Sequence, residues 1–300
     1  MTPGFIVHRK SRNCQRLKIV GAVLWRALWA FPLVSCSRHY HVQGMIVSIK
    51  PEARTIVVSH RAVPGYMEAM EMPFLVKRGE ELHRLVPGAQ VQFELEIRSG
   101  TALAEKIRIE PGSAQGIVQD RGLTVTLPVS RERISHGELV PDFELTDQLG
   151  HSIRLSDFYG RVVVVNFTYT RCPLPEVCPR LASNFARLQR RFQQRLGTEL
   201  ILLSITLDPK YDTPEVLQKY CKAWGADPKG WHFLTGSDRV IRTVADRLGL
   251  IYWPEEGFLT HTSLTCLIGR DGRLEARVDG SGYEVQQLGD LIARQLEMTR

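Results

Sequence analysis

The chain has 300 residues, which is enough for two domains with separate hydrophobic cores. Apolar residues make up 43% of the sequence and charged residues 24%, the ordinary composition of a globular protein. The net charge of +7 is modest, and no basic patch is interleaved with aromatic residues, which argues against nucleic-acid binding. Six cysteines are too few to form a disulfide scaffold in a chain of this length.

Residues 1–36 have the layout of an export signal. Basic residues precede a largely apolar stretch from Ile19 to Cys36, which contains one charge, Arg26. The stretch ends in Leu33-Val34-Ser35-Cys36, which resembles a bacterial lipobox, so we expect Cys36 to be lipidated after cleavage. An uncleaved segment would instead remain as a membrane anchor. Either outcome predicts a periplasmic or other extracytoplasmic protein that is attached to a membrane through its N-terminus.

Residues 39–111 predict a small all-β domain. Short segments with alternating apolar residues are separated by turn signals such as Pro87-Gly88. Five strands in about seventy residues suit a small OB-like barrel. The expected strands are Gln43–Lys50, Thr55–Ser59, Met72–Val76, Val91–Ile97 and Leu103–Ile109.

A methionine-rich segment distinguishes this predicted barrel. Met67, Met70 and Met72 are half of the six methionines in the chain. Met70 and Met72 alternate, so on a strand they face the same side. Their thioether sulfurs and the imidazole of His60 form a soft ligand set that selects Cu(I). Methionine also fills ordinary cores, but the neighbouring glutamates make this segment too polar for a simple core strand.

The segment resembles the CusF-like periplasmic copper-binding domain, a five-stranded barrel that holds Cu(I) through one histidine and two methionines under a capping tryptophan. The resemblance implies that His60, Met70 and Met72 are the copper ligands. Met67 stands where that family usually has the tryptophan, so either Met67 adds a third thioether or Tyr66 serves as the cap. The spacing from His60 to Met70 is one residue shorter than the family pattern.

Residues 112–135 are expected to form a linker with weak strands, and residues 136–300 a second domain. In the second domain strands alternate with helices before a closing hairpin, which predicts an α/β thioredoxin-like sandwich. The expected elements are a hairpin of Pro141–Asp147 with His151–Leu155, buried strands Val162–Thr170 and Glu199–Leu207, helices capped by Thr213 and Ser237, strands Ser263–Ile268 and Leu274–Val278, and a last helix Val285–Met298.

Cys172 and Cys178 lie on a loop between the predicted central strand and a helix, which is expected to stop at Gly197. A helix N-terminus favours the thiolate through its dipole and free N–H groups, and Pro179 suits the first helical turn. Thiolate is the form that binds metals or attacks disulfides. The structural alternative is a buried disulfide or a pair of inert core cysteines. Cys221 and Cys266 are expected to be core cysteines.

Three further segments, together with Asn166–Pro179, resemble the Sco/SenC family. They are Asp208–Pro214, the stretch Trp253–Ser263 that contains His261, and the turn Asp271–Arg273. Members of this family have a thioredoxin-like fold and act in copper delivery to the dinuclear copper centre of cytochrome c oxidase. The resemblance implies the same role here.

By position, the resemblance implies Cys172, Cys178 and His261 as copper ligands and Asp208 as a nearby carboxylate. Five residues separate the two cysteines, two more than is usual in the family. Two thiolates and one imidazole can bind either Cu(I) or Cu(II). The longer loop can therefore shift the preference between the two oxidation states, or favour a simple dithiol.

The sequence thus predicts an extracytoplasmic metallochaperone, not an enzyme, that delivers copper to the copper-bearing subunit of cytochrome c oxidase or to another copper acceptor. One alternative is a thiol–disulfide oxidoreductase of the thioredoxin-like class that uses Cys172 and Cys178 as its redox pair, although such enzymes usually space the cysteines by two residues. Another is a copper-resistance or buffering protein, for which the methionine domain would suffice.

Two soft-metal sites on one chain also predict a relay. Thiolates bind copper more tightly than thioethers, so Cu(I) is expected to pass from the barrel site to the cysteine site. The linker makes such a transfer effectively intramolecular. Two independent sites without exchange are the alternative.

Overall fold

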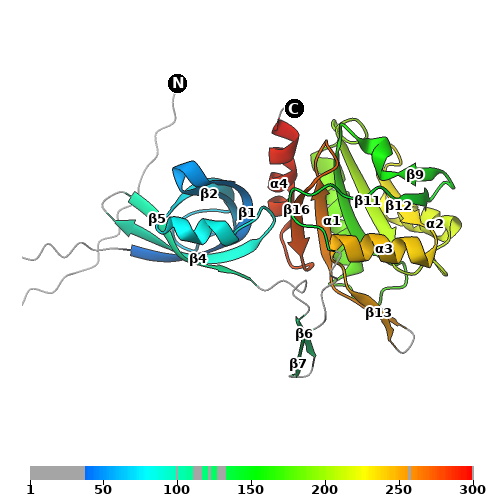
Figure 1. The fold of residues 1–300 in the computed structure, drawn as a ribbon, viewed down its shortest axis with the longest axis horizontal. Helices are drawn as coiled ribbons and strands as arrows, with labels where there is room; N and C mark the ends of the chain where they lie inside the picture. The colour runs from blue at the N-terminus through cyan, green and yellow to red at the C-terminus, as the bar shows by residue number, and fades with distance from the viewer. Residues whose placement is uncertain are drawn as a thin grey trace, which may run out of the picture. The chain divides into compact units, whose positions relative to one another are not determined.

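The computed structural model describes residues 38–98, 101–110, 117–120, 123–126, 133–255 and 258–298. These residues belong to one unit, which contains a β-barrel and an α/β domain (Figure 1). The expected leader, with Arg26 and Cys36, lies outside the described residues. Within the described ranges, no helix is both long and apolar enough to cross a bilayer.

The predicted five-stranded barrel is confirmed. It closes in the order β1-β2-β3-β5-β4. The second and third strands, which carry the expected barrel ligands, pair antiparallel along their whole length. The strands are β1 (Arg38–Lys50), β2 (Thr55–His60), β3 (Met70–Val76), β4 (Gln90–Arg98) and β5 (Thr101–Ile109), with 3-10 helices at Pro51–Ala53 and Gly79–Arg84.

The first strand of the barrel is longer than expected, for a physical reason. β1 begins at Arg38 rather than Gln43, because its first residues pair with β4 from Arg38 onward. At Gly44 this long strand crosses β2 so closely that a Cβ atom would lie 2.7 Å from the carbonyl oxygen of Ser59. Only glycine fits at that crossing. In the predicted linker, β6 (Ile117–Asp120) and β7 (Leu123–Thr126) pair as an antiparallel hairpin.

The α/β domain is built on a seven-stranded sheet with the order β16-β15-β10-β11-β12-β8-β9. The three central strands β10, β11 and β12 are parallel and the outer ones antiparallel, which confirms the thioredoxin-like architecture. The strands are β8 (Glu144–Asp147), β9 (Ser152–Arg154), β10 (Val162–Thr168), β11 (Leu200–Thr206), β12 (Trp231–Thr235), β15 (Leu264–Ile268) and β16 (Leu274–Asp279).

Helices cover both faces of this sheet. One hydrophobic core joins the sheet to α1 (Cys178–Arg191), α2 (Pro214–Trp224) and α4 (Val285–Glu297), and a second core joins its other face to α3 (Asp238–Leu248). Successive valines of β10 enter the two cores in turn. A strand that is buried on both faces must be apolar along its whole length, which explains the unbroken apolar run in the sequence.

The predicted helix caps are confirmed, but the end of α1 is not where the sequence places it. The side chains of Thr213 and Ser237 accept hydrogen bonds from the backbone N–H groups of Val216 and Val240. α1 ends at Arg191, six residues before the expected stop at Gly197. Gly197 instead has a φ of +82° in the following turn, where a Cβ atom would lie 2.6 Å from a neighbouring carbonyl oxygen.

The barrel contacts α4 through an apolar centre and a few hydrogen bonds. Met45, Val47 and Val57 of the barrel belong to the same core as α1 and α4. The Ser59 hydroxyl donates to the carboxylate of Asp290 at 2.7 Å, and both side chains are buried. The two domains are therefore in contact, and the linker is not the only connection between them.

Candidate metal centre

Cys172 and Cys178 lie at the connection between the central strand β10 and the helix α1. β10 ends at Thr168, and α1 begins at Cys178 with Pro179 in its first turn. Cys178 is fully buried, whereas Cys172 on the loop is half-buried. All four cysteines in the described ranges are free thiols, so the structural disulfide considered for this pair is not formed.

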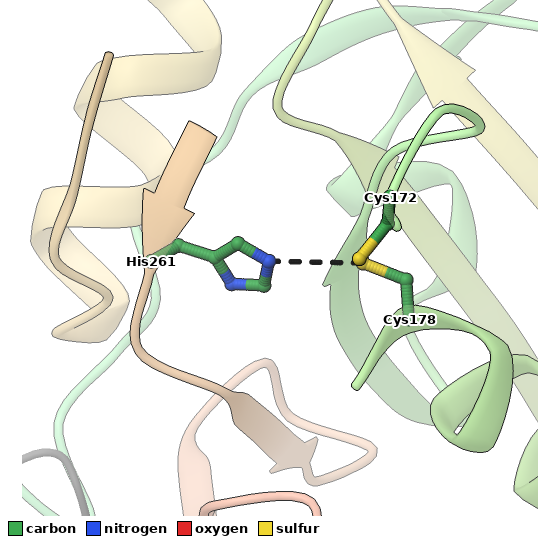
Figure 2. Close-up of side chains that lie close together, drawn as sticks. All are labelled: Cys172, Cys178 and His261. Carbon is green, nitrogen blue, oxygen red and sulfur yellow. Dashed lines mark hydrogen bonds between the residues drawn. The ribbon is translucent and has the colours of Figure 1, made fainter. Parts of the chain in front are cut away.

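His261 comes from a different part of the chain. It ends β14 (Phe258–His261), which pairs with β13 (Tyr252–Glu255) in a separate hairpin that the sequence pattern did not predict. Figure 2 shows its imidazole pointing at the two sulfur atoms. Its Nε2 lies 3.7 Å from the Sγ of Cys178, and the three possible ligand atoms lie within 4.8 Å of one another. The structure thus brings the three predicted residues together.

The backbone fixes which nitrogen of His261 is free. Nδ1 lies 2.9 Å from the carbonyl oxygen of Thr262. Because a carbonyl can only accept, Nδ1 carries the proton, and Nε2 keeps its lone pair toward the sulfur atoms. A neutral imidazole with a free Nε2 is a form that binds metals.

The two thiols share one proton. A hydrogen bond from the Cys178 thiol lowers the pKa of Cys172 to about 4. The same hydrogen bond, together with burial, raises the pKa of Cys178. At neutral pH the pair therefore consists of one thiolate and one thiol, and a metal that binds both sulfurs must displace the remaining proton.

Tyr169 closes one side of this cluster. Its ring meets the imidazole of His261 edge to face at 5.9 Å, and its hydroxyl donates to the carbonyl oxygen of Leu259 at 3.3 Å. Burial, followed by the negative charge of Cys172, raises the pKa of Tyr169 to about 12. Its hydroxyl therefore stays neutral beside the thiolate.

Asp208, the expected nearby carboxylate, is held by a cation next to the cluster. It forms an ion pair with Arg171 at 2.5 Å, and the Arg171 guanidinium lies 4.1 Å from the ring centre of Tyr211. Sequence reasoning missed Asp212, which is fully buried and accepts hydrogen bonds from Thr170. The only sequence signal was that the Asp208–Pro214 motif contains a second aspartate.

The barrel brings two of its predicted residues together, His60 and Met70. His60 is 2% exposed, and its Nδ1 lies 2.8 Å from the carbonyl oxygen of Arg61, so Nδ1 is the protonated nitrogen. Its Nε2 is buried and has no hydrogen-bond partner among the described residues. His60 is the cross-strand neighbour of Met70, which is 43% exposed. A buried imidazole nitrogen without a partner beside thioethers fits a soft metal ion.

Met67 and Met72 are partly buried against the barrel core, and Met67 forms an isolated bridge with Val63. Tyr66, the alternative cap, stacks on Tyr40 with ring centres 4.2 Å apart. Its ring is thus engaged by another aromatic ring.

The fold and the site define a thioredoxin-like protein with two cysteines at the first helix of the fold and a histidine facing them. The SCO1/SenC family model matches residues 131–297, and the chain belongs to this family. The model of the copper binding periplasmic protein CusF matches residues 39–109.

Individual relatives match about half of this chain. A SCO2-like protein of Rickettsia typhi is 31% identical over 152 residues, which are 48% of this chain and 70% of the relative. A SCO1 protein homolog of Bacillus subtilis is 27% identical over 51% of this chain and 79% of its own. Among solved structures, a SCO1/SenC family lipoprotein from Bacillus anthracis is similar with 27% identity and a TM-score of 0.49, covering 54% of this chain and 96% of that one.

The shared proton predicts an unusual reactivity for Cys172. In the reduced, metal-free protein its pKa of about 4 makes it a thiolate throughout the range from about pH 6 to pH 8, so its rate of alkylation by iodoacetamide should stay nearly constant. In Cys178→Ala the hydrogen-bond donor is lost. The pKa of Cys172 should then rise toward the ordinary value of about 8.5, and the rate should climb with pH.

Mass spectrometry of the alkylated peptides follows Cys172 separately from the other thiols. Cys221→Ala is the control, because Cys221 is also buried but lies on α2 outside the cluster. This variant should keep the flat pH profile. A wild-type rate that rises tenfold per pH unit would show that Cys172 is an ordinary thiol.

Proposed function

We propose that the protein is an extracytoplasmic copper-binding protein that delivers copper for assembly of the dinuclear copper centre of cytochrome c oxidase. The observation that carries the proposal is the convergence of Cys172, Cys178 and His261, whose possible ligand atoms lie within 4.8 Å of one another. Membership of the SCO1/SenC family supports it. Similar solved structures of ScoI from Arabidopsis thaliana and from Bradyrhizobium japonicum have copper bound.

The donor set explains why copper fits the site. Two thiolates and one imidazole give three soft to intermediate ligands, and trigonal cysteine–histidine sites are typical of copper. Zinc also accepts such ligands, usually with water as a fourth. A delivery protein needs a site from which the metal can leave. Cys172 is half-buried on a loop and can move more readily than Cys178 at the start of α1.

A thiol–disulfide oxidoreductase is the second candidate, and one observation favours it. A thiolate at Cys172 hydrogen-bonded to a second thiol is also the state from which a redox pair attacks a substrate disulfide. The two functions differ in what His261 does. It is a ligand in a copper site, whereas disulfide exchange between the two cysteines does not require it.

The first function predicts a copper site that depends on the three residues. Changing both Cys172 and Cys178 to serine should abolish the sulfur-to-copper charge-transfer band of the copper-loaded protein. His261→Ala should weaken copper binding or shift the preference between Cu(I) and Cu(II), because it removes the only nitrogen ligand in the cluster. Optical titration of the reduced protein in both oxidation states, with zinc as competitor, measures these effects.

The matched control changes the other two described cysteines, Cys221 and Cys266, to serine. Both are buried outside the cluster, and burial raises the pKa of each to about 12. The charge-transfer band should survive in this control. Retention of the band without Cys172 and Cys178 would refute the site. In a strain that lacks the gene, oxidase assembly should return with the wild-type protein and not with the Cys172/Cys178 double variant.

The barrel is the second copper site of this proposal. His60, Met70 and Met72 would hold Cu(I), with Met67 as a further thioether, and the match to the CusF model supports this assignment. Cu(I) then passes to the cysteine site, where thiolates bind it more tightly. A buffering protein without delivery would need the barrel alone.

The relay is tested with two full-length variants. The donor carries Cys172→Ser and Cys178→Ser and is loaded with Cu(I) at the barrel. The metal-free acceptor carries leucine at Met67, Met70 and Met72. After mixing and separation, copper should be found on the acceptor, because only the acceptor keeps the Cys172 and Cys178 thiolates. An acceptor that also lacks both cysteines is the control. Copper that stays on the donor at equilibrium would reject this direction of transfer.

The proposed location rests on the leader. We propose that the mature chain starts at a lipidated Cys36 and partitions with membranes. Intact-mass measurement of the membrane fraction should show an N-terminal cysteine with several acyl chains, because a single chain holds a membrane only weakly. A Cys36→Ser variant should be released from the membrane or retain its leader. Cleavage at another residue, without lipid, would refute the lipoprotein form.

A further inference from the structure

Asp212 is a buried carboxylate whose contacts converge just before the cysteine loop. It is fully buried in the turn between β11 and α2. Its Oδ2 accepts a hydrogen bond from the backbone N–H of Thr170 at 3.1 Å, and its Oδ1 accepts one from the Thr170 hydroxyl. The hydroxyl of Thr206, the last residue of β11, also donates to Oδ2. Asp212 thus ties the end of β11 to the residue two positions before Cys172.

Such a contact is strong for a physical reason. A buried carboxylate is stable only when hydrogen bonds replace the water that it loses. Hydrogen bonds to an ionised group are roughly twice as strong as those between neutral groups. Asp212 accepts two hydrogen bonds from Thr170, so the chain is fixed in position where β10 ends and the cysteine loop begins.

The exposed side of the same segment is held as well. Arg171 forms its ion pair with Asp208 and lies over the ring of Tyr211. The turn that contains Asp208, Tyr211 and Asp212 therefore holds both residues that precede Cys172, one from the buried side and one from the exposed side. Cys178 needs no such support, because it belongs to α1.

We propose that Asp212 is a positioning residue for Cys172. Five residues separate the two cysteines, and a longer loop has more conformations in which the sulfur atoms lie apart. By fixing Thr170, the Asp212 carboxylate restricts this loop and keeps the Cys172 sulfur near Cys178 and His261. The part of the proposal that concerns copper rests on the function proposed above, whereas the part that concerns the two thiols does not.

The chain offers a matched control for a purely structural role. Asp147 is also a buried aspartate, at 2% exposure. Its Oδ1 accepts hydrogen bonds from the backbone N–H groups of Leu149 and His151, each at 2.8 Å. It therefore stabilises the turn of the β8–β9 hairpin, whose strands lie at the edge of the sheet and carry no residue of the metal cluster.

The experiment compares Asp212→Ala with Asp147→Ala in the full chain by two measurements. The first, without metal, is the equilibrium constant for disulfide formation with glutathione, in which the Cys172–Cys178 dithiol and oxidised glutathione give the protein disulfide and two reduced glutathiones. The second is the affinity for Cu(I), measured by competition with a chelator. Urea unfolding gives the stability of each variant.

Asp212→Ala should lower the copper affinity by about 10- to 100-fold, the usual effect of removing a group that orients a metal ligand. It should also lower the disulfide equilibrium constant, because the Cys172 sulfur is less often near Cys178. Asp147→Ala should lose stability while both constants stay within about twofold of wild type, since independent sites are usually additive. If the wild-type protein shows no copper site, the proposed function fails while the glutathione measurement still decides the role of Asp212.

Equal effects of the two variants on both constants, or no effect of Asp212→Ala beyond stability, would overturn the proposal. If Asp212→Ala does not fold, Thr170→Val decides, because it removes only the hydroxyl contact with Oδ1 and keeps the backbone N–H. It should change both constants in the same direction by a smaller factor. Wild-type constants in Thr170→Val would then refute the role of Asp212.

Discussion

A hydrogen bond between the two cysteines of the second domain sets the protonation of both sulfur atoms. Cys178 is buried at the start of α1, where a charge is costly, so it remains a thiol and donates a hydrogen bond to Cys172. The pKa of Cys172 is thereby lowered to about 4, so this residue is a thiolate at neutral pH. The site is then prepared for a soft cation, which needs to displace only one proton to gain two thiolate ligands. The lowered pKa of Cys172 and the raised pKa of Cys178 each depend first on the other cysteine.

The sheet fixes where this pair forms. β10 lies between two hydrophobic cores, and its parallel neighbour β11 ends beside it in register, with Thr168 opposite Thr206. Loops that leave the carboxyl ends of adjacent parallel strands therefore meet, and here they bring the turn with Asp212 against the cysteine loop. The rigid sheet fixes where the loops begin, while the loops contain the reactive cysteine Cys172. Cys172 therefore stays partly exposed on its loop and still lies near Cys178.

Local patterns in the sequence were sufficient for much of this arrangement. The β-branched run of β10, the caps Thr213 and Ser237, and the five barrel strands all follow from residues close together in the chain. The approach of His261 to Cys178 joins residues 83 positions apart, and no local pattern encodes it, so only the family resemblance could supply it. Asp212 was missed because the sequence does not show whether an aspartate is buried or exposed. The end of α1 was missed because apolar spacing does not show where a turn begins.

The two proposed copper sites lie in unrelated folds but prepare their histidines in the same way. His60 and His261 each direct Nδ1 to the carbonyl oxygen of the next residue, at 2.8 and 2.9 Å. In both, this contact places the proton on Nδ1 and leaves Nε2 free. The difference between the sites is in the sulfur. The barrel offers neutral thioethers, which need no proton release, whereas the second domain offers a thiolate and a thiol. The barrel site has no thiol to deprotonate, so copper binding there is expected to require no release of a thiol proton. Copper binding at the cysteines requires that release. In the proposed function, the higher copper affinity expected at the cysteines is attributed to ligand charge, because the two histidines have the same geometry.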